Sequence, residues 1–127
     1  MRTLLASVLL AVPFCGPVRA DEPKKLTPAE LKGLAEQNRT SSEAGMKHFQ
    51  RGQFDEAAKA FQKALDAARA ALPRDQFPKG HPVLATAIHN LAMAKKHLAE
   101  PAVGEAEALC REALAMNRQL FPKQDHE

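Results

Sequence analysis

Histidine is the side chain in this sequence most suited to metal binding or proton transfer, and the chain contains five of them. His89 and His97 stand eight residues apart in one predicted helix, so about 12 Å along the axis separates them. Two ligands of one zinc ion must lie much closer together. The remaining three lie in other predicted elements: His48, His81 and His126. We therefore expect no metal site.

The sequence also shows no nucleophile and no pair of carboxylates placed for catalysis. Cys110 falls on the apolar stripe of its predicted helix, where a thiol acts as a small hydrophobic side chain. Glu105, Glu107 and Glu112 fall on a predicted exposed face, and Glu107 with Arg111 forms an i, i+4 ion pair. The sequence shows no Ser-His-Asp arrangement and no glycine-rich phosphate loop. We expect no enzyme activity and no cofactor.

The first residues have the composition of an export signal. Residues 1–20 contain an early arginine, the apolar run LLASVLLAVPF at 4–14, and small residues before a cleavage position after Ala20. The apolar run is shorter than the roughly 20 residues needed to cross a bilayer. Cleavage at Cys15, as in a lipoprotein, is the alternative, but the bulky Phe14 disfavours it. We predict a bacterial protein that is exported, either periplasmic or secreted, with no membrane span after cleavage.

Signal removal changes both the charge and the cysteine count. The loss of Arg2 and Arg19 lowers the formal net charge from +3 to +1, which argues against nucleic acid as a partner because nucleic-acid binders carry a clustered basic face. Cys15 also leaves, so Cys110 alone cannot form an internal disulfide.

The remaining segments predict helices alone. Thr27, Pro28 and Glu30 form a capping-box signature for a helix that we expect to end near residue 37. The run NRTSS at 38–42 predicts a break, and a second helix is expected over about 41–50. Apolar residues recurring at three and four predict further helices, which span 55–72, 82–99 and 105–121. No stretch alternates at period two, so the fold class is all-α.

Two segments of the chain repeat each other. FPKGHP at 77–82 and FPKQDHE at 121–127 begin 44 residues apart, and each follows a predicted helix. The helix segment FDEAAKAFQKAL at 54–65 aligns with VGEAEALCREAL at 103–114. Each unit is therefore a helix, a turn, a second helix and a loop containing Phe-Pro-Lys.

These units resemble the tetratricopeptide repeat (TPR), over about residues 38–127. The small and large residues of its code are Ala44, Gly45, Gly52, Phe54, Ala57, Phe61 and Ala64 in the first unit, and Ala92, Ala106, Cys110, Ala113 and Leu114 in the second. Gly80-His81-Pro82 followed by Asn90-Leu91-Ala92 is similar to the longer type found in kinesin light chains, with His81 and Pro82 starting the helix.

The resemblance implies a right-handed α-solenoid of about two helical hairpins with an N-terminal capping helix. The domain organisation expected from it has four parts: a signal peptide at 1–20, a linker and N-terminal helix at 21–37, a first repeat at 38–80, and at 81–127 a second repeat with the start of a third loop. The second unit departs from the family pattern where Lys95 and Lys96 replace an aromatic residue.

The resemblance also implies a function: binding of a partner peptide or helix on the concave face, which the first helix of each unit lines. The implied contact residues are Arg39, Ser42, Met46, Phe49, His89, Asn90, Met93, Lys96 and His97. This mixture of apolar and basic side chains fits an extended peptide with an acidic group. The alternative is that Met46, Phe49 and Met93 only complete the core. The carboxylate-clamp set of some relatives is absent.

A second function remains open, namely a self-associating structural module in an envelope assembly. Two repeats leave the outer face of the last helix uncovered, and about three are usually needed to bury such faces. The uncovered residues are Leu109, Leu114, Leu120 and Phe121. They predict a homo-oligomer through the 105–121 helix.

Overall fold

The computed structural model describes residues 24–123, and its helices follow one another with short connections. The bounds are α1 (Pro28–Gln50), α2 (Phe54–Ala71), α3 (Pro82–Lys95) and α4 (Ala102–Leu120). These described residues contain no strand, so the predicted all-α fold class is confirmed. The predicted signal peptide and the last residues of the predicted third loop, 124–127, lie outside them.

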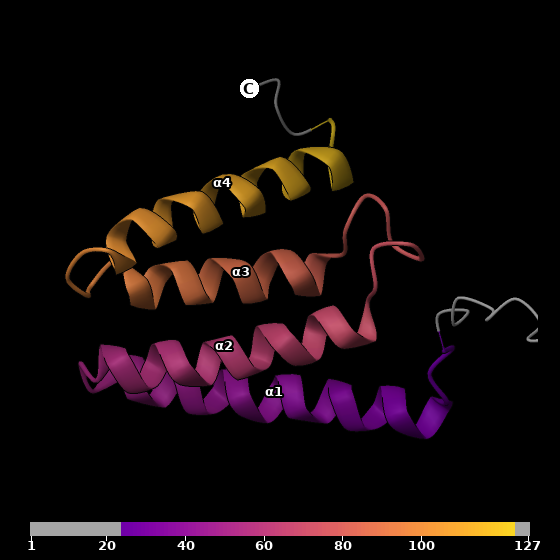
Figure 1. Ribbon diagram of the computed structural model, residues 1–127, viewed down its shortest axis with the longest axis horizontal. Coiled ribbons are helices and arrows are strands. Elements are labelled where there is room, and N and C mark those ends of the chain that lie inside the picture. The colour runs from indigo at the N-terminus through magenta and orange to yellow at the C-terminus, as the bar shows by residue number, and fades with distance from the viewer. Residues whose placement is uncertain (1–23, 124–127) are drawn as a thin grey trace, which may run out of the picture.

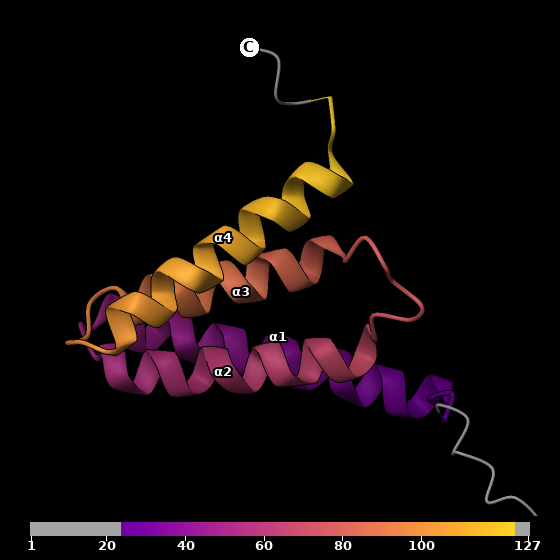
Figure 2. The ribbon, with the colours of Figure 1, turned by 45° about the horizontal axis from the view of Figure 1, so that its top comes forward.

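The four helices form layers in chain order (Figure 1). Helices α1 and α2 pair as one hairpin, α3 and α4 pair as a second, and α2 packs against α3 to join them. Both views place α4 as the outermost layer on the side away from α1 (Figures 1 and 2). The expected solenoid of about two helical hairpins is therefore confirmed.

Helix α1 begins where the sequence predicts. The Thr27 hydroxyl accepts a hydrogen bond from the backbone N–H of Glu30 at 3.2 Å, and the Glu30 carboxylate accepts one from the backbone N–H of Thr27 at 2.8 Å. This reciprocal capping box satisfies two backbone donors that the first turn of the helix leaves unpaired.

The predicted break in α1 is wrong, because one uninterrupted helix of 23 residues covers the segment. Asn38 points its side chain toward α2 and donates a hydrogen bond to the Ala64 carbonyl at 2.8 Å. The Thr40 hydroxyl donates to the Glu36 carbonyl at 3.0 Å, so this polar residue bonds within the helix instead of interrupting it. The expected N-terminal capping helix is therefore the first part of α1, not a separate element.

The turn between α3 and α4 also differs from the prediction. Helix α3 ends at Lys95 instead of residue 99, and α4 begins at Ala102 instead of 105. Pro101 precedes the first turn of α4, and the Glu100 carboxylate accepts a hydrogen bond from the backbone N–H of Gly104 at 3.3 Å. This contact supplies an acceptor for one backbone donor that the first turn of α4 leaves unpaired.

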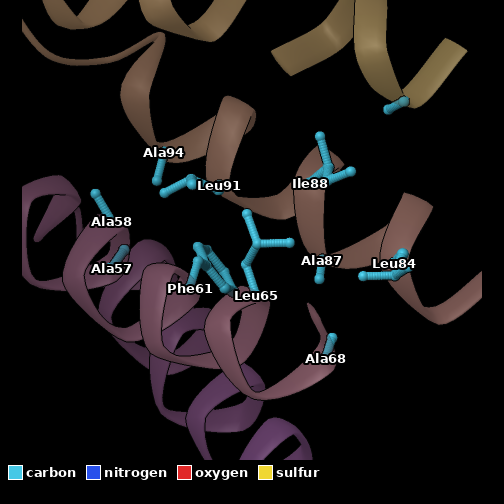
Figure 3. Packing of buried hydrophobic residues seen from close by; sticks show 11 residues of the cluster. Ala57, Ala58, Phe61, Leu65, Ala68, Leu84, Ala87, Ile88, Leu91 and Ala94 are labelled. Carbon is cyan, nitrogen blue, oxygen red and sulfur yellow. The ribbon is translucent and has the colours of Figure 1, made fainter. Parts of the chain in front are cut away.

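The core lies between α2 and α3 (Figure 3). Its largest fully buried side chains are Phe61, Leu65, Ile88 and Leu91, and most of the other buried residues are alanines. Small side chains let neighbouring helices approach closely. Gly45 of α1 shows this at its limit, because a Cβ atom there would lie 2.6 Å from two ring carbons of Phe61.

Candidate protein-binding surface

The nine predicted contact residues divide between two helices. Four lie on α1, namely Arg39, Ser42, Met46 and Phe49, and the other five lie on α3 or just after it, namely His89, Asn90, Met93, Lys96 and His97. Met46 is 39% exposed, which shows that it does not complete the core. Lys96 and His97 lie in the turn that follows α3, since that helix ends at Lys95.

One group of aromatic rings joins the two halves of this surface. The rings of Phe49 and His97 meet edge to face with centroids 5.4 Å apart, and Phe54 stacks on His97 at 4.2 Å with an interplanar angle of 11°. Phe49 and Phe54 also meet edge to face at 5.3 Å. We call these three residues the aromatic trio. The structure thus brings two predicted residues, Phe49 and His97, into direct contact.

Phe54 is the member of the aromatic trio that the sequence prediction missed. It is the first residue of α2, directly after the turn that ends α1. The repeat pattern marks it as a structural position, for which packing and not surface contact is expected. In a helical hairpin, a bulky side chain at the start of the second helix lies beside the end of the first helix. The position of Phe54 directly after the turn was therefore the sequence signal for this contact.

Arg39 is engaged within its own helix. Its guanidinium donates hydrogen bonds to Glu36 at 2.7 Å and to Glu43 at 2.7 Å. The hydrogen bond from Arg39 lowers the pKa of the Glu36 carboxyl, and the same bond raises the pKa of Arg39. All three side chains are exposed, so water screens the pairs. Two neighbouring carboxylates nevertheless offset the positive charge that an acidic peptide would require.

Two hollows on the surface lie apart from the predicted contact residues. The larger, of about 730 Å³, is lined on α1 by Thr40, Ser41, Ala44 and His48. At 100° per residue, these side chains point to the side of α1 opposite Arg39, Met46 and Phe49. None of the nine predicted residues lines either hollow.

The smaller hollow lies where α4 meets the loop between α2 and α3. It measures about 410 Å³ and has a floor that includes Leu84 and Ile88. Gly80 in this loop has a φ of +86°, and a Cβ atom there would lie 2.5 Å from the side chain of Met116. The loop that carries the Phe-Pro-Lys repeat is therefore in close contact with α4, which fixes its position.

The histidines and the cysteine have local roles in the structure. His81 caps α3, since its Nδ1 accepts a hydrogen bond from the backbone N–H of Val83 at 3.2 Å, as predicted. His48 Nδ1 lies 2.7 Å from the side-chain oxygen of Gln53. Cys110 is half-buried, not fully buried as its stripe predicts. Within residues 24–123, no group of three or more His, Cys, Asp or Glu side chains is placed to hold a metal ion.

The predicted ion pair on α4 is present, and two further pairs link α4 to other helices, Arg69–Glu112 to α2 and Lys95–Glu105 to α3. Glu107 and Arg111 lie 3.8 Å apart. Lys95, at the position where the family pattern has an aromatic residue, is partly buried and pairs with Glu105 of α4. In the part of the chain described here, no helix is long and apolar enough to cross a membrane.

Comparison with known proteins identifies the repeat. The model of a tetratricopeptide repeat matches the chain twice, over residues 45–82 and again over 84–127. Searches of curated proteins and of solved structures gave no match. The two matches cover more than half of the chain, the first from the last residues of α1 through α2 and the second across α3 and α4, so this protein belongs to the tetratricopeptide repeat family.

Proposed function

We propose that this protein is a non-enzymatic interaction module that binds a partner peptide or helix on the face formed by α1 and the end of α3. Tetratricopeptide repeats generally mediate protein–protein interaction, and the family is typically non-enzymatic. The observation that carries the proposal is the aromatic trio, because it unites residues of α1, α2 and the turn after α3 in one patch.

The chemistry of this patch defines the partner. Phe49 and Phe54 are half-buried and His97 is exposed, so the rings are anchored in the protein while part of their surface faces solvent. Met46, exposed on the same side of α1, adds an adaptable apolar side chain. Lys96 precedes His97 in the sequence, is exposed, and supplies positive charge. The favoured partner carries an apolar or aromatic anchor with an acidic group beside it.

We also propose that the protein is exported and that its repeats are of the long, kinesin-light-chain type. The composition of residues 1–20 supports export. The Gly-His-Pro loop supports the long type, since its histidine caps α3. Intact-mass measurement of the protein recovered from its native cells tests export. A chain that begins at Asp21 supports it, and a mass that retains residues 1–20 contradicts it.

Peptide binding is tested with a probe selected from random peptides displayed on phage. Fluorescence polarisation of the labelled peptide then compares Met46→Glu and His97→Glu with the unchanged protein. We expect each to weaken binding by about tenfold or more, equivalent to about 1.4 kcal/mol. Lys63→Glu, an exposed change on α2, is the control. Equal affinities for all four proteins would rule out this face.

A second candidate function is self-association through α4. The observation in its favour is the exposure of two large apolar side chains, Leu114 at 51% and Phe121 at 44%. Both belong to the face that the sequence predicts to be uncovered. Light scattering of residues 21–127, which contain all four helices, tests it over a range of concentrations. A monomer throughout the range would exclude this candidate and leave peptide binding unaffected.

A further inference from the structure

The smaller hollow, of about 410 Å³, lies away from the proposed peptide-binding face. Helix α3 forms its floor, and the rest of its lining comes from the end of α2, from α4 and from the loop of residues 72–81. The aromatic trio includes the first residue of α2, whereas this hollow lies at the other end of that helix. Figure 2 shows α4 diverging from the other helices on the side of this loop. Small-molecule sites have volumes of about 300–1,000 Å³, and the hollow falls within this range.

The base and sides of the hollow are apolar. Leu84 and Ile88 form its floor and belong to the core of the protein. Leu72 and Met116 are half-buried, pack against the same core and line the hollow from α2 and α4. Phe77 adds a half-buried ring from the loop. Because the core already holds these side chains, an apolar ligand can bury its surface here with little further ordering of the protein.

The rim of the hollow carries an excess of positive charge. The charged side chains in its lining are Arg69, Arg74, Lys79 and Glu112. Arg69 and Glu112 pair with each other at 3.4 Å, so their charges offset one another. Arg74 and Lys79 are exposed and form no ion pair within residues 24–123. Asp75, the acidic residue of the same loop, is not part of the lining. Two cations therefore remain for an anionic group of a ligand.

We propose that this hollow binds a small amphipathic carboxylic acid. Its apolar tail lies on Leu84 and Ile88, and its carboxylate lies at the rim. There Arg74 offers a planar pair of donors and Lys79 a point charge, both of which suit a carboxylate. Four segments surround the hollow, which favours a small molecule over an extended peptide. The proposal is independent of peptide binding by the aromatic trio and of self-association through α4.

The first test titrates octanoate into residues 21–127, which contain all four helices, and measures the heat of binding. We expect one saturable site with a dissociation constant of about 1 mM or below, an ordinary affinity for a ligand of this size. Octylamine has the same tail with a positive charge, so it should bind at least about tenfold more weakly. Octanoate that shows no saturable binding up to about 10 mM, or that binds no more tightly than octylamine, would overturn the proposal.

The second test locates the carboxylate. Arg74→Glu and Lys79→Glu reverse the charges of two exposed loop residues, and each should raise the dissociation constant of octanoate by about threefold to tenfold. Lys32→Glu is the control, because this exposed lysine of α1 does not line the hollow. Equal affinities for the three variants and the parent would show that the rim cations do not hold the ligand, and would overturn the proposal.

The third test locates the tail. Ala115 lines the hollow from α4 and is exposed, so Ala115→Phe should fill the hollow and abolish octanoate binding. Ala108→Phe is the matched control, since this exposed alanine lies about two turns earlier on the same side of α4 and outside the lining. It should leave the affinity unchanged. Circular dichroism checks that both variants keep their helices. Octanoate that binds Ala115→Phe as tightly as the parent would overturn the assignment to this hollow.

Discussion

Gly45 is the position where a single methyl group should have the largest effect on this fold. It is the buried residue of α1, and a Cβ atom there would lie 2.6 Å from the Cδ1 and Cε1 atoms of Phe61. The Phe61 ring is 2% exposed and cannot turn outward without displacing the core. Replacing Gly45 with alanine therefore forces either the ring or the whole of α1 to move.

The size of the effect follows from two opposing contributions. Alanine favours the helix by about 1 kcal/mol relative to glycine. Overpacking a well-filled core costs about 1–3 kcal/mol, and the contact of the new methyl group with two ring carbons places Gly45→Ala near the upper end. We expect a net loss of about 2 kcal/mol in the free energy of unfolding. For a domain of this size the midpoint of thermal unfolding should fall by about 8–16 °C.

Urea unfolding followed by far-ultraviolet circular dichroism measures this loss. Gly33→Ala is the matched control, because it lies in the same helix with nothing within 4 Å of the new methyl group. It should stabilise the protein by about 0.5–1 kcal/mol. The double variant Gly45→Ala with Phe61→Leu should be less destabilised than the two single effects added together. A Gly45→Ala protein as stable as the parent would refute the close-packing argument.

Three smaller changes test other contacts. Asn38→Ala removes the hydrogen bond to the Ala64 carbonyl and should cost about 1 kcal/mol in urea unfolding, and an unchanged midpoint would show that this bond does not hold α1 to α2. The capping-box hydrogen bonds should lower the pKa of Glu30 below its ordinary 4.5, which an NMR titration measures. The cap is therefore stable above that pH and is lost as the pH falls through the lowered value. Thr27→Ala keeps the backbone N–H but removes the hydroxyl, so this pKa should move only part of the way back upward, and no movement would contradict a role for the Thr27 side chain. Gly80→Ala should destabilise the protein by more than about 1 kcal/mol, because its φ of +86° disfavours any residue with a Cβ, and equal thermal midpoints would count against a fixed loop.

The sequence predicted the helices whose amphipathic pattern is strong and missed the continuity of α1. Phe61 and Leu65 recur at helical spacing in α2, and that helix lies within one residue of its predicted bounds at each end. In α1 the local sequence around Asn38 and Thr40 favours a break. The deciding contact is made with Ala64, which is 26 residues away, so a local pattern carries no signal of it.

The candidate surface was also predictable only in part. The repeat pattern placed Phe49 and His97 on one face, and the structure brings their rings together. It assigned Arg39 to partner binding, although Glu36 and Glu43 lie at the right spacing to pair with it. Opposite charges three and four residues apart on a helix predict such pairs from the sequence alone.

Because the outer side of α1 is polar and that of α4 is apolar, a further repeat can pack after α4 more readily than before α1. A further repeat appended after α4 would bury Leu114 in the register that Leu65 already uses. A repeat fused ahead of α1 would have to desolvate Gln37 and Ser41 against an apolar helix. Duplication of the α3–α4 hairpin after α4 can therefore lengthen the candidate surface without new substitutions, because α3 carries the apolar residues Leu84, Ile88 and Leu91 that such a contact needs.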